Sequence, residues 1–335
     1  MLKVLITGAT GFVGSHALEA LMQRDDIELV AHAREKSRLL PEFKGETRIG
    51  DLRDDTFVAN LVCGMDVVIH AATWSSLFKH QQASHELFYR PSINLINRCV
   101  MAGVKRFVNI STTSAAVPGN SENANSSGVE HKFWPHLVNL VRIENRLREL
   151  ADQKLSVINL RLGIFTGRRY SLGLLPILVP RLKTHLVPWV AGGQTTLPLI
   201  DGRDIGRAIT RAIDADMEHS FESINVIGPE KPTVRVVIDF IHHEFGYPRP
   251  HFSVPFWLAY PFAGLMEFIN PLVPFDPLVT RSIIHLLEET HTNNDKAREL
   301  LGYEPKYDWR DTVRLQLNEM NERQIHPMRM AKPVH

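Results

Sequence analysis

The sequence predicts an α/β fold in which a doubly wound parallel sheet carries helices on both faces, with a smaller, interleaved part toward the C-terminus. Three observations support this prediction. Short runs rich in β-branched residues alternate with helix-patterned stretches in the first half of the chain. The first run leads directly into a glycine-rich turn and a helix. A late run over 224–227 is typical of a strand that returns to the same sheet.

The first element is a strand over 2–6, which is followed by a glycine-rich turn and a helix over 12–22. Glycines suit such a turn because they permit a tight backbone, close approach of a pyrophosphate and close packing of the helix. The free N–H groups at the start of the helix would then face phosphates. The spacing predicts a Rossmann-type dinucleotide site contacted by Gly8, Thr10, Gly11, Phe12 and Val13.

The second strand, over 27–33, ends where this type of fold contacts the adenosine ribose. An acidic residue there would select NAD, but the next residue is Arg34. A guanidinium can donate two hydrogen bonds to a phosphate, so Arg34 favours the 2′-phosphate of NADP, with NAD as the alternative cofactor. A solvated basic loop is the competing interpretation, because Glu35 partly offsets the charge.

Two further strands end at the same edge of the sheet, where ligands bind in open parallel sheets. The strand over 47–50 is followed by Asp51 and Leu52. Asp51 could accept a hydrogen bond from the adenine amino group, or it could cap the helix that starts near Asp54. The segment over 66–73 is almost wholly apolar, as expected of a buried parallel strand. It ends in small residues that leave room for a cofactor, Ala71, Ala72 and Thr73.

These motifs resemble the extended short-chain dehydrogenase/reductase family, which includes the NAD-dependent epimerases and dehydratases. The resemblance covers nearly the whole chain and continues through Gly103-Val104-Lys105-Arg106, Leu160-Arg161-Leu162-Gly163 and Leu301-Gly302-Tyr303-Glu304-Pro305. The segment from Val254 through Pro277 to Arg281, the residues 293–296 and the Leu301–Pro305 ending are similar to the 3β-hydroxysteroid dehydrogenase-like branch. The resemblance implies a nicotinamide cofactor with Gly163 among its contacts, and an alcohol or ketone of a sterol or other lipid as substrate.

The family uses a serine, a tyrosine and a lysine four residues later for its proton chemistry. Ser114 matches the serine and is expected to orient the substrate oxygen. Counting from Glu144 places His136 at the tyrosine position and Leu140 at the lysine position. No lysine of the chain has a tyrosine four residues before it, so the pair is missing from the whole sequence. Phe88 also departs from the family, which has an asparagine there.

His136 is the candidate that could replace the missing tyrosine. Imidazole titrates near neutrality, so we expect His136 to donate a proton with a pKa near 6 to 7. The competing interpretation is an ordinary residue of a helix N-terminus, since His136 directly follows Pro135.

Composition limits the range of partners. The chain has 38 basic and 37 acidic residues, so it shows no electrostatic footprint for nucleic acid. Its 16 histidines are scattered, and no metal site is expected. The segment 252–275 carries one charge but four prolines, which argue against a membrane span. A membrane-touching hairpin and an apolar wall of the substrate pocket remain as alternatives.

The expected organisation is a dinucleotide-binding domain over 1–165 with a returning strand near 222–228. A substrate-binding domain would comprise 166–221 and 229–325, followed by a tail over 326–335. The helix over 137–150 has enough apolar positions to form a homodimer with a copy of itself. Because the first strand starts at residue 2, no signal peptide is expected, and the protein is predicted to be cytoplasmic or peripheral to a membrane.

Two functions are compatible with these features. The first is an NAD(P)-dependent oxidoreductase for a hydrophobic, lipid- or steroid-like alcohol or ketone, working without the usual tyrosine and lysine. The second is a dinucleotide-binding protein without redox turnover, serving as a sensor, an assembly subunit, or a redox-neutral isomerase, cyclase or lyase. The glycine loop and Ser114 favour the first, which we prefer, and the missing pair favours the second.

Overall fold

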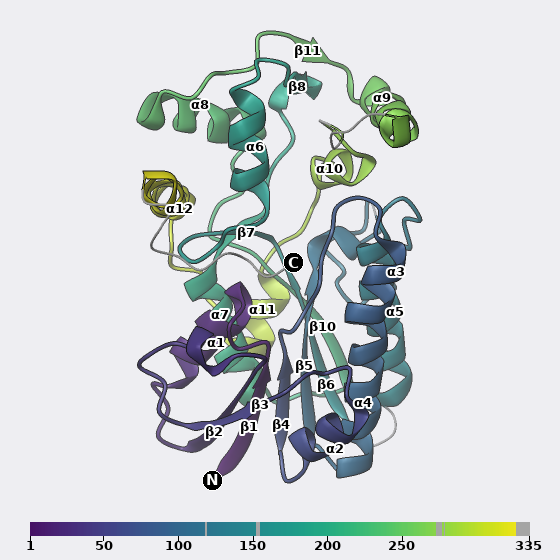
Figure 1. Cartoon of the computed structure of the whole chain (residues 1–335), viewed down its shortest axis with the longest axis vertical. Helices are drawn as coiled ribbons and strands as arrows, with labels where there is room; N and C mark the ends of the chain where they lie inside the picture. Colours follow the sequence, from purple (N-terminus) through teal and green to yellow (C-terminus); the bar gives the residue numbers. More distant parts are fainter. Residues whose placement is uncertain (118, 152–154, 273–276, 278, 326–335) are drawn as a thin grey trace.

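A seven-stranded sheet forms the lower tier of the computed structural model, which describes residues 1–117, 119–151, 155–272, 277 and 279–325 (Figure 1). The strand order is β10-β6-β5-β4-β1-β2-β3, and every pairing in this sheet is parallel. Its members are β1 (Leu2–Thr7), β2 (Ile27–Ala33), β3 (Glu46–Ile49), β4 (Val67–His70), β5 (Arg106–Thr112), β6 (Ser156–Leu162) and β10 (Phe221–Val226). The predicted α/β class with a doubly wound parallel sheet is confirmed.

Helices cover both faces of this sheet because its central strands are apolar on both sides. One face is covered by α1 (Phe12–Leu21), α7 (Gly202–Asp214) and α11 (Asp295–Leu301). The other is covered by α2 (Asp55–Val62), α4 (Arg90–Ala102) and α5 (Pro135–Ala151). The short helix α3 (Gln81–Ser84) runs through a π-helical turn, His85–Tyr89, directly into α4. Pro91, which has no backbone N–H, follows this irregular turn.

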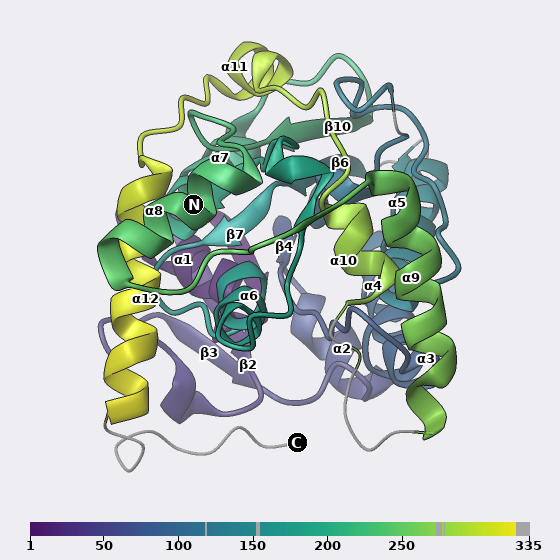
Figure 2. The same ribbon diagram turned by 90° about the horizontal axis from the view of Figure 1, so that it is seen from above.

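The upper tier lies over the carboxyl edge of the sheet (Figures 1 and 2). It contains two small parallel sheets, β7 (Ile164–Thr166) with β9 (Leu199–Asp201), and β8 (Trp189–Val190) with β11 (Ser253–Val254). Its helices are α6 (Leu174–Leu182), α8 (Val234–Phe245), α9 (Phe256–Ile269), α10 (Arg281–Leu286) and α12 (Trp309–Ile325). The chain passes between the tiers more than once, because α7 and β10 return to the lower tier.

Two helices lie outside the tier to which the expected boundaries assign them. Both α7 and α11 pack on the lower sheet, although the ranges 166–221 and 229–325 place them with the substrate-binding part. The apolar side chains of α7, such as Ile205 and Ile209, are buried against α1 and the sheet. The division into two domains stays a prediction, and the tail over 326–335 lies outside the described residues.

The apolar positions of α5 are used within the chain. Leu137, Leu140, Val141, Ile143 and Leu147 are all buried, whereas Arg142 and Glu149 of this helix are exposed. These positions therefore offer no apolar surface for pairing with a copy, and a homodimer stays a prediction.

The apolar segment 252–275 contains α9, which has two different faces. Ala259 and Ala263 are buried toward α10, while the opposite side exposes Trp257 (72%) and Phe268 (80%). Among the described residues, no helix has both the length and the apolar character needed to cross a bilayer. The segment is thus a surface helix with an uncovered apolar face.

Candidate functional site

The glycine loop after β1 is shaped by close backbone contacts. Gly8 has a φ of +67°, and a Cβ added there would lie 2.6 Å from Cα of Ala72 at the end of β4. A Cβ on Gly14 would lie 2.2 Å from the carbonyl oxygen of Gly8. Larger residues would therefore push the loop away from β4 and α1. No side chain caps the first turn of α1 in the described structure, so its N–H groups remain available to a pyrophosphate. This cradle fits a dinucleotide.

A buried histidine that the sequence interpretation passed over holds this loop in place. The backbone N–H of Gly8 donates to Nδ1 of His32 at 3.4 Å, and Nε2 of His32 donates to the carbonyl of Gly50 at 3.2 Å. This arrangement requires a single neutral tautomer. Burial lowers the pKa of His32, which keeps the ring neutral. His32 thus connects the ends of β1, β2 and β3. In the sequence, a polar residue inside an otherwise apolar strand was the signal that could have indicated this structural role.

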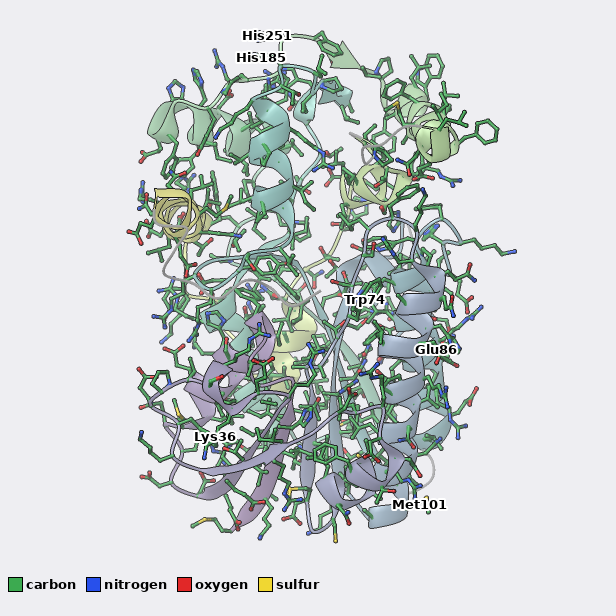
Figure 3. All side chains as sticks on the ribbon, in the orientation of Figure 1. Lys36, Trp74, Glu86, Met101, His185 and His251 are labelled. Carbon is green, nitrogen blue, oxygen red and sulfur yellow. The ribbon has the colours of Figure 1, made fainter. Side chains whose placement is uncertain are left out.

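The predicted ribose and adenine contacts lie at the outer end of the sheet. Arg34 is exposed and directly follows β2, while Lys36 lies nearby on the flank of the lower tier (Figure 3). Asp51 accepts hydrogen bonds from the backbone and side chain of Arg53, at 2.9 and 3.0 Å. These hydrogen bonds, with a further contribution from Arg34, lower the pKa of Asp51. The helix-cap alternative for Asp51 is wrong, because Asp54 caps α2.

The other predicted cofactor contacts occupy the same edge. Ala71, Ala72 and Thr73 follow β4 opposite Gly8, and Leu52 packs partly buried beside α2. Gly11 and Thr10 belong to the loop, and Phe12 and Val13 begin α1, where the ring of Phe12 lies 4.4 Å from that of Tyr170. Gly163 follows β6, and a Cβ there would lie 2.1 Å from the carbonyl oxygen of Pro198. The close approach of the backbone at Pro198 is therefore enough to require a glycine at this position. The contact of Gly163 with the cofactor stays a prediction.

Ser114 lies in a short helical turn, Thr113–Ala115, at the end of β5. Its backbone N–H donates to the hydroxyl of Thr112 at 3.2 Å, which holds the turn against the strand. Ser114 lines a cavity of about 30 Å³ together with residues of the upper tier, among them His285, Glu288 and Glu289. A cavity of this size holds about one water-sized group. The serine is therefore placed where a substrate oxygen could be bound between the tiers.

His136 and Leu140 lie against the core. The ring of His136 is 5.0 Å from that of Phe88, and Leu140 is buried in the same apolar cluster as Phe88. Burial lowers the pKa of His136 to about 4, and its Nδ1 is enclosed without a hydrogen-bond partner. The expectation that His136 titrates near neutrality is wrong for this reason. The three residues that depart from the family thus lie together, and apolar packing takes the place of the missing pair.

The structure instead brings three other titratable residues to Ser114. His285 of α10 donates from Nε2 to the backbone oxygen of Ser114 at 2.9 Å. Its Nδ1 lies 3.0 Å from Glu288, which also accepts a hydrogen bond from the hydroxyl of Tyr260 in α9. Burial alone would raise the pKa of Glu288, but the hydrogen bonds from His285 and Tyr260 lower it. Burial and Glu288 raise the pKa of Tyr260. Only the i, i+3 spacing of His285 and Glu288 hinted at this group in the sequence.

A second cavity, of about 520 Å³, lies elsewhere. It is lined by His185, Trp189, Arg235 and His251, among others. Figure 3 shows His185 and His251 at the far end of the upper tier, away from the carboxyl edge of the sheet. No group of three or more His, Cys, Asp or Glu in the described ranges could hold a metal ion. The glycine loop and Ser114 therefore mark the candidate site.

Comparison with known proteins agrees with this geometry. The NAD dependent epimerase/dehydratase family matches residues 4–227. The chain is 23% identical to the sterol-4-alpha-carboxylate 3-dehydrogenase, decarboxylating, of Dictyostelium discoideum, covering 92% of this chain and 98% of the relative. It is 25% identical to the 2-alkyl-3-oxoalkanoate reductase of Stenotrophomonas maltophilia, covering 91% and 95%. It is 26% identical to human 3 beta-hydroxysteroid dehydrogenase type 7, covering 93% of each chain.

Solved structures share the fold. The crystal structure of gox2253 superposes with a TM-score of 0.76 at 20% identity, covering 98% of this chain and 99% of the other. The UDP-glucose 4-epimerase of Thermus thermophilus, in complex with NAD, superposes with a TM-score of 0.67 at 20% identity, covering 96% and 99%. At these identities the superpositions establish the common fold.

Proposed function

Because the chain belongs to the NAD dependent epimerase/dehydratase family, we propose that it is an NAD(P)-dependent oxidoreductase for a hydrophobic, lipid- or steroid-like alcohol or ketone. One observation carries the proposal: a single edge of the sheet joins the glycine loop, the small residues after β4 and the hydroxyl of Ser114. The names of the relatives support a hydrophobic alcohol or ketone as substrate. They are a sterol-4-alpha-carboxylate 3-dehydrogenase, a 2-alkyl-3-oxoalkanoate reductase and a 3 beta-hydroxysteroid dehydrogenase.

The residues of this chain would hold the cofactor, which when bound donates or accepts a hydride. The loop around Gly8 and the N-terminus of α1 would bind the pyrophosphate. The family is NAD-dependent, and we further propose a preference for NADP because Arg34 is exposed at the end of β2. Ser114 would donate a hydrogen bond to the substrate oxygen. His136 is a poor candidate for proton transfer, because its ring is neutral at physiological pH.

The test combines binding with turnover. Titration calorimetry should show that the intact protein binds NADPH and NADH, and that Gly14→Val abolishes this binding because its side chain would overlap the carbonyl of Gly8. Gly264→Ala is the matched control, since its Cβ would meet no atom closer than 3.8 Å. Turnover is followed by the absorbance of reduced nicotinamide, with a 3β-hydroxysteroid and a 2-alkyl-3-oxoalkanoate as probes. Binding without turnover of either probe would contradict the oxidoreductase.

A second function is favoured by the packing of His136 and Leu140 against Phe88. A protein that binds the dinucleotide without redox turnover, as a sensor, an assembly subunit or a redox-neutral enzyme, has no need of the tyrosine and lysine at these positions. The same experiment separates the two functions. Nucleotide binding that persists while no hydride leaves the nicotinamide would favour the second.

We also propose weak membrane contact through α9. Its exposed face carries large apolar residues, including Trp257, Phe262, Leu265 and Phe268. Such a face can lie in the interface of a bilayer without crossing it. The protein expressed without detergent should stay largely in the soluble fraction and should float weakly with phosphatidylcholine vesicles. Recovery only from membranes after a carbonate wash would show that α9 is more deeply inserted.

A further inference from the structure

Three titratable side chains of the upper tier form a connected group beside Ser114. The hydroxyl of Tyr260 in α9 donates a hydrogen bond to one carboxylate oxygen of Glu288, and the other carboxylate oxygen lies 3.0 Å from Nδ1 of His285. Nε2 of His285 lies 2.9 Å from the backbone oxygen of Ser114. The side chain of His285 is only 4% exposed and lines the same cavity as Ser114. His285 therefore reaches the turn that carries Ser114, beside the position expected for the substrate oxygen.

The hydrogen-bond partners define the protonation state of His285. The carbonyl oxygen beside Nε2 can only accept, and the ionised carboxylate beside Nδ1 can only accept. The hydroxyl of Tyr260 lies 3.5 Å from Nδ1 but donates to Glu288. Both nitrogens of His285 are thus placed to donate, an arrangement that suits an imidazolium. The other titratable groups that face it are Tyr260, Glu288 and His131, whose ring lies 4.4 Å away. Burial, and then the charge of His285, lower the pKa of His131, which disfavours a second cation beside His285.

We infer that His285 is the proton carrier of this site, and that Glu288 and Tyr260 are positioning residues that hold its ring toward Ser114. The inference rests on the proposed oxidoreductase function. It assigns to α9 and α10 the proton chemistry that the family resemblance implies for a tyrosine and a lysine at the positions of His136 and Leu140. This placement is independent of His136, which packs against Phe88 instead.

The proton and the hydride balance in a reduction. The substrate carbonyl carbon accepts a hydride from a reduced nicotinamide dinucleotide, which is the co-reactant, and the C=O π bond breaks. The Nε2–H of His285 exchanges the backbone oxygen of Ser114 for the substrate oxygen as its acceptor, and the N–H bond breaks as its proton forms the O–H bond of the product alcohol. The ring is left neutral, with Nδ1–H still donated to Glu288. A proton from solvent then restores the imidazolium, and oxidation of an alcohol follows the same steps in reverse.

The first test is spectroscopic and needs no substrate. In protein labelled with ¹⁵N-histidine, the resonances of His285 are identified by their loss in His285→Gln. At neutral pH they should show both nitrogens protonated in the wild type and a neutral tautomer in Glu288→Gln. Glu289→Gln is the matched control, because Glu289 lines the same cavity but accepts from Thr196. A neutral His285 in the wild type would overturn the inference, whatever the turnover of the substrate probes.

The second test is kinetic and uses the 2-alkyl-3-oxoalkanoate with NADPH. His285→Gln should lower kcat at least about 100-fold with KM changed only a few-fold, as for loss of a general acid. The exposed His243→Gln should leave both unchanged. The rate of wild-type reduction should fall with rising pH in step with the imidazolium resonance, and this fall should move to lower pH in Glu288→Gln.

The outcomes separate the inference from the proposed function. Wild-type turnover that survives His285→Gln within a few-fold would overturn the inference and leave the oxidoreductase intact. Nucleotide binding with no turnover of any probe would overturn both. Because His285→Gln could weaken contact between the tiers, Tyr260→Phe provides a milder variant that keeps the packing of its ring. It should shift the pH profile with a circular dichroism spectrum like that of the wild type, and an unshifted profile would count against the positioning role.

Discussion

Replacement of Glu144 by glutamine should be among the most destabilising single changes in the lower tier. Its carboxylate accepts from Ser111 at 2.5 Å, from Asn159 at 2.9 Å and from Arg161 at 3.1 and 2.6 Å. The side chains of Glu144 and Arg161 are 2% and 0% exposed, respectively. The pair connects α5 with β6, and Ser111, which lies three residues before Ser114, connects Glu144 with β5. Its loss would therefore affect both stability and the candidate site.

The magnitude follows from the charge that is left behind. Glu144→Gln leaves the guanidinium of Arg161 buried without its counter-ion, which costs about 3 to 5 kcal/mol. At about 2 °C per kcal/mol for a long chain, the melting temperature should fall by roughly 6 to 10 °C. Urea titration and thermal unfolding, both followed by circular dichroism, measure these changes.

Two further variants test the reasoning. Glu130→Gln breaks the exposed pair with Arg142, in which the side chains are 39% and 49% exposed, and should cost less than about 1 kcal/mol. The double change Glu144→Leu with Arg161→Met removes both charges and should recover most of the lost stability. A loss below about 1 kcal/mol for Glu144→Gln, or no recovery in the double variant, would refute the argument from an uncompensated buried charge.

Three other predictions concern the cofactor, the sequence candidate for proton transfer, and pH. Arg34→Ala should reduce the preference for NADPH over NADH by about 1 to 3 kcal/mol in fluorescence titrations, and equal affinities in the intact protein would exclude a phosphate contact. His136→Ala should change turnover at neutral pH by less than about tenfold, because the ring is neutral there; a loss of about 100-fold would restore His136 as the proton donor. Burial lowers the pKa values of His16, His70 and His136 to about 4, so below about 6.5 the unfolded chain binds protons that the folded chain does not. The free energy of unfolding should therefore decrease as pH falls from about 6.5 to about 4, by up to about 1.4 kcal/mol per pH unit for each histidine, and a flat profile by urea titration would contradict this.

The sequence alone determined the class of fold and the position of the glycine loop after β1. Both depend on local patterns. An apolar run indicates a buried strand, and a glycine in the turn indicates a backbone position at which a side chain would clash. The strand β2 has the predicted bounds, Ile27–Ala33, and the loop at Gly8 packs closely on Ala72. The absence of a tyrosine and lysine pair is likewise a property of the sequence by itself.

Only the tertiary structure decided which side chains meet Ser114. His285 follows it by 171 residues, and nothing in the local pattern of α10 indicates that its ring reaches the turn after β5. The same holds for His136, whose chemical type suggested an acid near neutrality, whereas its ring packs against Phe88 with a pKa lowered to about 4. Hydrogen bonding and burial are set by neighbours distant in sequence, and these neighbours decide whether a histidine carries a proton.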